Sequence, residues 1–356
     1  MVKTRYRQST CILLLTVVVV VCVCMWINYR SRPNIWHVSS EIYESEMHTK
    51  KSTCCECDFC RDNVPPHKQK SRMEGPIHFC IAAGNAEVVK EFEPLVKTLV
   101  LHAKRTDLVL HILTGNGSDN KIKKILNTIQ NIPVKFNYEL VPLNTDIILN
   151  ETLKINLRIT HHSGIWGMSK LYMYDIFNNV DKCIVLDTDI VFGTDPAFLW
   201  DHFMDQEDQE MISMRITNEM TESYMSNSGL MLQDFSRMRQ VTFSKFYFAA
   251  VKWLCGKVAV CSDQEVLFSL FKNNGSYLFR TLPLSWNLEL CHEFFGFSFE
   301  TYTDWQGRFF GGAHFNCGGA ENKALELFSA SNSASNLRDY VKYLINVPMQ
   351  DVCSVM

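Results

Sequence analysis

The sequence predicts an α/β protein with a doubly wound, largely parallel sheet, preceded by one N-terminal membrane segment. Three observations carry this prediction. An uncharged run rich in Leu and Val occupies residues 11–27. From Ile77 onward, apolar strand-like segments alternate with helical segments, as in βαβ units. A β-branched stretch at 182–192 contains two aspartates, and open α/β sheets bind ligands where such strands end.

The overall composition is that of a globular protein with one membrane segment. The chain has 356 residues, of which 47% are hydrophobic and 21% are charged, and its net charge is −3. This length suffices for one large or two small domains. The balanced charge gives no indication of binding to nucleic acid or to an anionic surface.

Residues 11–27 predict a single-pass signal anchor. The 17-residue run is at the short end of what spans a bilayer, and short spans are sorted toward thin membranes early in the secretory route. Basic residues are slightly more numerous before the run, which favours a cytoplasmic tail at 1–10. A cleavable signal peptide is the alternative, but no small-residue cleavage site follows the run. We therefore expect a type II protein of the Golgi or endoplasmic reticulum membrane, with residues 31–356 in the lumen.

Two further features favour the lumen. Acceptor triplets for N-glycosylation begin at Asn116, Asn150 and Asn274. Of the 14 cysteines, 11 follow the membrane segment, where an oxidising compartment permits disulfides. Because this number is odd, at least one thiol is free or pairs between chains.

Residues 28–75 predict a polar stem that contains a cysteine cluster at 54–60. Zinc binding is one interpretation, but no second group of Cys or His with finger-like spacing is nearby. Disulfides, which could link two chains into a dimer, fit the pattern better.

The folded domain is expected at 76–356. A strand at 77–85 ends in small residues, and a helical pattern follows at 87–104. Strands at 108–113 and 134–141 and helices at 122–129 and 168–177 continue the alternation, which predicts a parallel sheet covered on both faces. Neither a G-x-G-x-x-G motif nor a Walker lysine loop is present, which argues against dehydrogenases and P-loop proteins.

The stretch at 182–192 is expected to be one strand that carries the site. Asp187 and Asp189 are two positions apart, so on a strand their side chains point to the same side. Oxygen ligands of this kind suit Mg²⁺ or Mn²⁺. A polar turn after a core strand is the alternative, because isolated D-x-D triplets occur often by chance.

Segments farther along supply more polar candidates. Strands are expected at 211–216, 228–232 and 277–282, and helices at 237–254, 263–271 and 336–345. Ser262 is a plausible N-cap before Asp263, although a negative charge at a helix N-terminus is also favourable without any catalytic role. His314 lies amid glycines at a strand end, a setting that suits a ligand as well as a structural histidine.

Taken together, these segments resemble the lumenal members of glycosyltransferase family 8, which have a GT-A fold, a Rossmann-like mixed sheet flanked by helices. The resemblance covers roughly residues 77–325. Its landmarks, in the family's order, are Ala82-Ala83-Gly84-Asn85, Asp187-Thr188-Asp189, Asn227-Ser228-Gly229, Asp263-Gln264, Trp286-Asn287 and His314-Phe315-Asn316. The stretch at 162–167 with Lys170 is similar to LARGE-type xylosyltransferase domains, and 286–291 is similar to xyloside xylosyltransferases. Both branches transfer xylose from UDP-xylose with an α linkage.

The resemblance implies a metal site and a reacting centre. Asp187, Asp189 and His314 would hold Mn²⁺ (or Mg²⁺) against the diphosphate of the donor. Asp263 and Gln264 would lie beside the reacting carbon of the sugar.

The resemblance also implies a nucleotide-sugar site. Its residues would line the uridine pocket, lie near the donor, or contact the donor sugar or the acceptor. They are Ala82, Ala83, Gly84, Asn85, Lys170, Thr188, Asn227, Ser228, Gly229 and Asn316.

Two departures from the family pattern keep alternatives open. The family usually has the sequence Asp-Gln-Asp, but in this chain the third residue is Glu265. After the histidine, Cys317-Gly318-Gly319 stands in place of the usual glycine and lysine. We expect a retaining, Mn²⁺-dependent α-xylosyltransferase that uses UDP-xylose and acts on a glycan of a lumenal glycoprotein. The alternatives are a transferase for another UDP-hexose and a catalytically inert relative that acts as a scaffold or glycan binder. A metal phosphoesterase is a distant further alternative.

Overall fold

The computed structural model describes residues 73–84, 88–103, 107–115, 117–129, 135–154, 159, 163–216, 226–246, 262–272, 276–289, 311–315 and 336–349. The expected cytoplasmic tail, the membrane span at 11–27 and the stem as far as residue 72 lie outside these ranges. Among the described residues, no helix is both long and apolar enough to cross a membrane.

The first half of the large sheet is parallel, as expected. It contains β1 (Ile77–Ala83), β2 (Leu108–Thr114), β3 (Phe136–Pro142) and β4 (Lys182–Leu186). Strand β1 pairs in parallel with β2 on one side and with β4 on the other. The strand order therefore reverses at β1, and the carboxyl ends of β1 and β4 flank a topological switch point.

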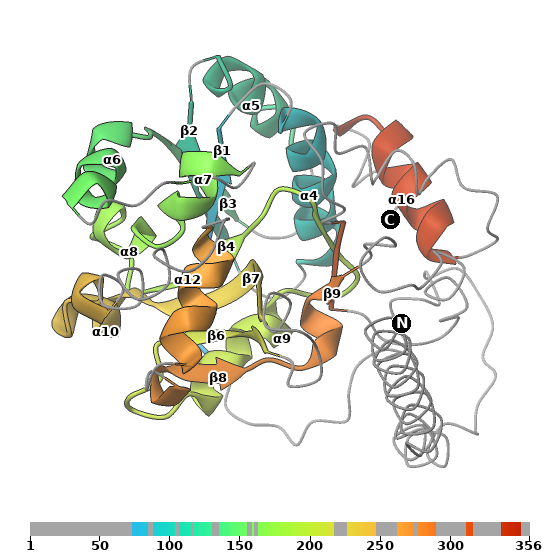
Figure 1. Cartoon of the computed structure of the whole chain (residues 1–356). Coiled ribbons are helices and arrows are strands. Elements are labelled where there is room, and N and C mark those ends of the chain that lie inside the picture. Colours follow the sequence, from blue (N-terminus) through green and yellow to red (C-terminus); the bar gives the residue numbers. More distant parts are fainter. Residues whose placement is uncertain are drawn as a thin grey trace, which may run out of the picture. The chain divides into compact units, whose positions relative to one another are not determined.

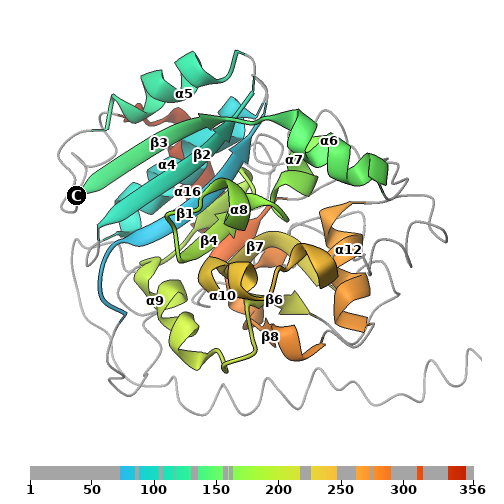
Figure 2. The ribbon, with the colours of Figure 1, turned by 90° about the vertical axis from the view of Figure 1, so that its left-hand side faces the viewer.

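The second half makes the sheet mixed. Strand β7 (Ser226–Asp234) is antiparallel to both β4 and β6 (Ile212–Ile216), and β8 (Phe279–Thr281) is parallel to β6. The complete order is β3-β2-β1-β4-β7-β6-β8, and Figure 2 shows β3, β2, β1 and β4 side by side.

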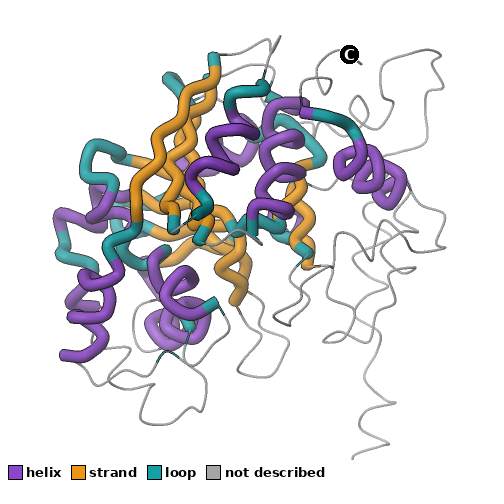
Figure 3. The backbone as a smooth tube through the Cα atoms, turned by 90° about the horizontal axis from the view of Figure 1, so that it is seen from above, coloured by secondary structure: helices purple, strands orange, loops and turns teal. Residues whose placement is uncertain are grey.

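Helices cover both faces of this sheet, as Figures 1 and 3 show. One hydrophobic core lies under α4 (Val89–His102), α5 (Asp119–Leu126) and α9 (Ala197–Trp200). The other lies under α7 (Gly164–Ser169), α8 (Met173–Ile176), α10 (Phe235–Gln240) and α12 (Asp263–Leu270). Within the described ranges, the other helices are α6 (Thr145–Lys154), α16 (Asn336–Asn346) and the 3₁₀ turns η1 (Asp201–Asp205), η3 (Ser276–Leu278) and η4 (Leu284–Trp286).

Successive side chains of β1 alternate between the two cores. Phe79 and Ile81 belong to the first core and Cys80 to the second, and all three are fully buried. Burial of a side chain such as Phe79 contributes about 1.5–3 kcal/mol. On the second face, a disulfide joins Cys80 to Cys183 of β4. The two strands that flank the switch point are therefore linked covalently.

A small second sheet stands beside the first. Strand β10 (Gly312–His314) is antiparallel to β5 (Ile190–Phe192) and parallel to β9 (Leu288–Glu289). The expected single strand at 182–192 is therefore wrong, because the chain leaves the large sheet after Leu186 and enters the small sheet at Ile190.

Two expected helices also differ from the structure. The helix expected at 168–177 is divided into α7 and α8, because the N–H groups of residues 170–172 donate to carbonyls three positions earlier, as in a tight turn. The helix expected at 237–254 is interrupted after Gln240, where Thr242 has a φ of 55°. A β-branched residue in this left-handed conformation cannot continue an α-helix.

Candidate active site

Asp187 and Asp189 lie in the turn that connects the two sheets. The N–H of Asp187 donates to the carbonyl of Gly229 on β7 at 2.8 Å, and the N–H of Phe315 donates to the carbonyl of Asp189 at 3.0 Å. The first end of the turn is thus bonded to the large sheet, and its second end is bonded to the residue that follows β10 of the small sheet. The two carboxylates converge because of this anchoring and not because they share one face of a strand.

The third predicted ligand, His314, joins these carboxylates. Its Nε2 lies 3.2 Å from Asp189 Oδ1 and 3.7 Å from Asp187 Oδ2. One ligand atom from each of the three residues lies within 4.8 Å of the others. Two carboxylate oxygens and an imidazole nitrogen are ligands that fit Mn²⁺ or Mg²⁺, so this group, which we call the metal group, could hold a divalent cation.

Asn287 orients the imidazole of His314. The amide nitrogen of Asn287 donates to Asn227 Oδ1 at 2.8 Å, which leaves its Oδ1 to accept from His314 Nδ1 at 3.2 Å. Without a cation, Nε2 can carry a proton and donate to Asp189 at 3.2 Å. When Nε2 gives up that proton, its lone pair faces the aspartates and can bind a cation. Asparagine therefore serves as the outer partner that metal-binding histidines usually have.

Gly229 makes room for that imidazole. A Cβ atom at this position would lie 2.1 Å from His314 Cε1 and 2.5 Å from Nδ1. The glycine is needed because a ring occupies the space of a side chain. The structure thus gives Gly229 a role in placing a predicted ligand, while its expected contact with the sugar stays a prediction.

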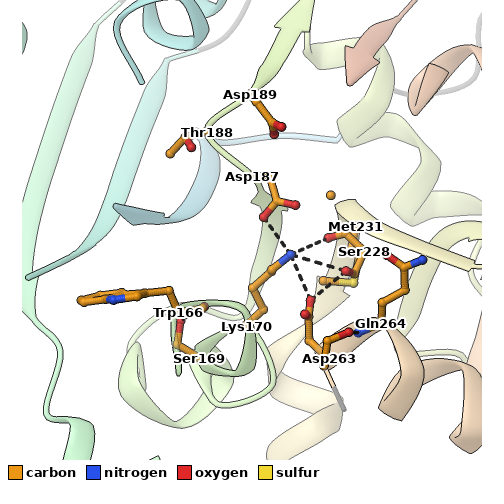
Figure 4. Close-up of polar contacts among 12 residues, drawn as sticks. Trp166, Ser169, Lys170, Asp187, Thr188, Asp189, Ser228, Met231, Asp263 and Gln264 are labelled. Carbon is orange, nitrogen blue, oxygen red and sulfur yellow. Dashed lines mark hydrogen bonds and ion pairs between the residues drawn. The ribbon is translucent and has the colours of Figure 1, made fainter. Parts of the chain in front are cut away.

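Lys170 forms the centre of a second cluster, shown in Figure 4. Its Nζ lies 2.7 Å from Asp187 Oδ1 and 3.0 Å from Asp263 Oδ2. It also donates to the carbonyl of Ser228 at 3.3 Å. Burial lowers the pKa of Lys170, but the two carboxylates outweigh it and the pKa is raised above its usual value. The ammonium group therefore stays charged and links the metal group to Asp263.

Asp263 is buried in this cluster and accepts two hydrogen bonds. Its Oδ2 accepts from Lys170 and from Ser228 Oγ, the latter at 2.7 Å. It begins α12, where Ser262 is the N-cap, as expected. Glu265 accepts from the N–H of Ser262 at 2.9 Å and completes a capping box. The unusual Glu265 therefore has a structural reason.

The other predicted residues are distributed around these two clusters. Gln264 follows Asp263, and its side chain lies on the far side of Asp263 from Trp166 in Figure 4. Thr188 Oγ1 donates to Glu91 Oε2 at 3.2 Å, and Asn227 belongs to the network that orients His314. Asn85 and Asn316 lie outside the described residues.

At the end of β1, Ala82 and Ala83 lead to a buried Gly84. A Cβ at Gly84 would lie 2.1 Å from the Trp166 ring, and a Cβ at Gly115 after β2 would lie 2.8 Å from it. The small residues after β1 and β2 therefore make room for the chain's own indole. Binding of uridine by these residues stays a prediction.

The three acidic groups in and beside the metal group have pKa values that are shifted for different reasons. Burial is the largest cause that raises the pKa of Asp187, while Lys170 opposes it. Burial also raises the pKa of Asp189, but the charge and hydrogen bond of His314 outweigh it and lower the value overall. Burial, followed by repulsion from Asp189, raises the pKa of Glu91 to about 8.

Three residues of this region were not predicted from the sequence. Glu91 lies in the first turn of α4, where the helical pattern gives no sign of a partner 97 positions away. Asn287 was named only as a family landmark, and Trp166 only as part of a similar stretch. Their roles depend on contacts between distant segments, which local patterns do not reveal.

The family is decided by comparison with known proteins. The family model described as "Glycosyl transferase family 8" matches residues 80–290, which is more than half of the chain. The chain belongs to glycosyltransferase family 8. The matched region of this glycosyltransferase contains both aspartates of the turn and Asp263, and it ends before His314.

Similar proteins include the xylosyl- and glucuronyltransferases named LARGE. The mouse LARGE1 protein is 24% identical over 272 residues, which cover 70% of this chain and 35% of that protein. The chicken LARGE2s protein is 25% identical over 246 residues, which cover 63% of this chain and 32% of that protein. The match thus spans about a third of the length of these relatives.

Solved structures show the same fold. Mouse xyloside xylosyltransferase 1 in its apo form has a TM-score of 0.54 and 20% identity, covering 68% of this chain and 98% of that one. The galactosyltransferase LgtC with donor and acceptor sugar analogs has a TM-score of 0.54 and 15% identity, covering 77% of this chain and 99% of that one. This likeness confirms the expected GT-A-like arrangement of a mixed sheet with flanking helices.

Proposed function

We propose that this family 8 enzyme is a retaining, Mn²⁺-dependent xylosyltransferase. It moves xylose from UDP-xylose, with an α linkage, to a glycan on a lumenal glycoprotein. The observation that carries the proposal is the convergence of Asp187, Asp189 and His314 beside the Lys170–Asp263 cluster. The metal group would bind the diphosphate of a nucleotide sugar, and the Lys170–Asp263 cluster would bind its sugar.

The metal group fits the leaving group of the reaction. When bound, a divalent cation supplies Lewis-acid stabilisation of the charge that develops on the departing diphosphate. The carboxylates of Asp187 and Asp189 and the Nε2 atom of His314 would hold this cation. Asn287 keeps the Nε2 lone pair available, and the turn between the sheets leaves Asp187 partly exposed. Donor oxygens can therefore reach the site.

Lys170 and Asp263 fit the reacting sugar. Cleavage of the donor makes the sugar carbon electron-poor, and a fixed carboxylate beside it is stabilising. Asp263 Oδ2 already accepts two hydrogen bonds, which stabilise its charge and reduce its nucleophilicity. This favours electrostatic stabilisation by Asp263, with same-face attack by the acceptor hydroxyl, over a covalent intermediate on Asp263.

The printed names of the relatives support xylose as the donor sugar. The LARGE proteins are xylosyl- and glucuronyltransferases, and one structural neighbour is a xyloside xylosyltransferase. A galactosyltransferase has an equal TM-score, so a transferase for another UDP-hexose is the second candidate. Glu265, which favoured an inert relative, is a capping residue and no longer argues for one.

The Cys80–Cys183 disulfide supports the lumenal placement of the domain. Both cysteines are fully buried in neighbouring strands of the central sheet, and such bonds form in oxidising compartments. A signal anchor at 11–27, a stem at 28–75 that could form a disulfide-linked dimer, and a Golgi or endoplasmic reticulum location complete the proposal.

A donor screen tests the proposed function. The full-length protein is purified in detergent, and UDP release is measured with UDP-xylose, UDP-glucose and UDP-galactose, each with Mn²⁺ and with a chelator. We expect Mn²⁺-dependent release from UDP-xylose alone. Release from a hexose donor instead would establish the second candidate, and no release from any donor would contradict both.

A further inference from the structure

The carboxyl group of Glu91 borders the metal group without belonging to it. Its Oε2 accepts a hydrogen bond from Thr188 Oγ1 at 3.2 Å. On the same helix, Thr98 Oγ1 accepts from the N–H of Phe192 at 3.1 Å. These two bonds hold α4 along the segment from Thr188 to Phe192. The segment that places the aspartates therefore also places Glu91.

Among the described residues, no basic side chain forms an ion pair with Glu91, although the charge of His314 acts on it from a distance. Lys170 and His314 both pair with site aspartates, and within the described part of the chain no ion pair includes Glu91. A third acidic group beside two aspartates repels them, and its partial burial adds to the cost. Glutamine could accept the same hydrogen bond from Thr188 without that cost. An acid at such a position indicates a ligand that needs it.

The order of groups along a nucleotide sugar directs the ribose toward Glu91. This step rests on the proposed function, in which the sugar lies at Lys170 and Asp263 and the diphosphate at the metal group. The nucleoside must then continue from the metal group away from Lys170. In Figure 4, Thr188 and Lys170 lie on opposite sides of Asp187, and Thr188 is the residue bonded to Glu91. The ribose, which directly follows the diphosphate, would therefore reach this carboxyl group.

We propose that Glu91 binds a ribose hydroxyl of the donor nucleotide. A divalent cation in the metal group favours the ionised form of a neighbouring acid. The resulting carboxylate accepts hydrogen bonds from hydroxyl groups, and acidic residues bind ribose hydroxyls in other doubly wound folds. Thr188 acts as a positioning residue that holds the carboxyl group in place. Glu91 is not a metal ligand in this arrangement.

Nucleotide binding without turnover tests the proposal. Dissociation constants for UDP, 2′-deoxy-UDP and 3′-deoxy-UDP are measured by calorimetry with Mn²⁺ for the full-length wild type, Glu91→Gln and Glu91→Ala. Glu93→Gln is the matched control, because it makes the same change on the same helix at a carboxylate that pairs with Lys97. We expect Glu91→Ala to weaken UDP binding about ten-fold and Glu93→Gln to leave it within two-fold.

The deoxy nucleotides identify the contact. Removing the contacted hydroxyl should weaken wild-type binding by about the same factor and should cost Glu91→Ala nothing further, because both changes delete one interaction. Additive losses with both deoxy nucleotides would overturn the proposal. So would a fall in Mn²⁺ affinity without nucleotide, measured by electron paramagnetic resonance. If Glu91→Ala does not fold, the near-isosteric Glu91→Gln carries the test, with a smaller loss of the same pattern. Failure of the wild type to bind UDP would instead contradict the proposed function itself.

Discussion

The substitution Gly229→Ala tests the placement of His314 most sharply. Its Cβ would lie 2.1 Å from His314 Cε1, and ordinary contacts begin at 3.4 Å, so the ring must retreat by about 3.4 − 2.1 = 1.3 Å. The ring is 3% exposed and bonded to Asn287, so any retreat must break this hydrogen bond or move buried neighbours. Metal–ligand distances tolerate changes of only about 0.2 Å. We therefore expect Mn²⁺ affinity, measured by electron paramagnetic resonance, to fall at least 10-fold, as for loss of an outer-shell partner.

A double-mutant cycle with His314→Ala shows whether steric displacement is the cause. If it is, Gly229→Ala added to His314→Ala should cost no further Mn²⁺ affinity, because the displaced ring is already gone. Wild-type Mn²⁺ affinity in Gly229→Ala would show that the ring can move without leaving the metal group. Additive losses would show that Gly229 acts on the site by another route.

Three further predictions follow from the neighbouring clusters. Lys170→Met should destabilise the fold by about 3–5 kcal/mol in urea denaturation, because it leaves Asp263 buried without its cation; an unchanged midpoint would contradict the importance of this pair. Glu265→Ala should lower the free energy of unfolding by about 1 kcal/mol in the same measurement, whereas Glu265→Gln should retain the capping box with Ser262. Equal losses of stability in the two variants would contradict the role of Glu265 as a cap. Because folding raises the pKa of Glu91 from 4.5 to about 8, the folded state binds that proton more tightly and metal-free protein loses stability as the pH rises from 5 to 8. Melting temperatures of Glu91→Gln should fall less over this range, and parallel curves would contradict the shift.

The fold could be predicted where a pattern is local and repeated. The alternation of strands and helices from Ile77 to Leu186 gave the parallel half of the sheet, because each element buries a periodic apolar face. The break between α7 and α8 could not be predicted in this way. It consists of a tight turn at residues 170–172, and Lys170 in this turn pairs with carboxylates on other elements, contacts that a hydrophobic pattern does not encode.

The candidate site was predictable where the family supplied the order of its landmarks. Asp187, Asp189 and His314 are brought together as expected, although the local reason given for the aspartates, a shared strand face, was wrong. Glu91 and Asn287 had no comparable signal, since each acts through a residue far away in the sequence. Residues that act through such distant contacts can be identified only from the three-dimensional structure.

A metal-dependent site at Asp187 is tested by the Mn²⁺ dependence of UDP release from UDP-xylose in the wild type and in Asp187→Ala. Asp208→Ala, at an exposed aspartate in a turn, is the control. We predict saturable activation by Mn²⁺ in the wild type and the control, and loss of nearly all release in Asp187→Ala. Equal rates in all three proteins would contradict a metal-dependent nucleotide-sugar site at the turn between the two sheets.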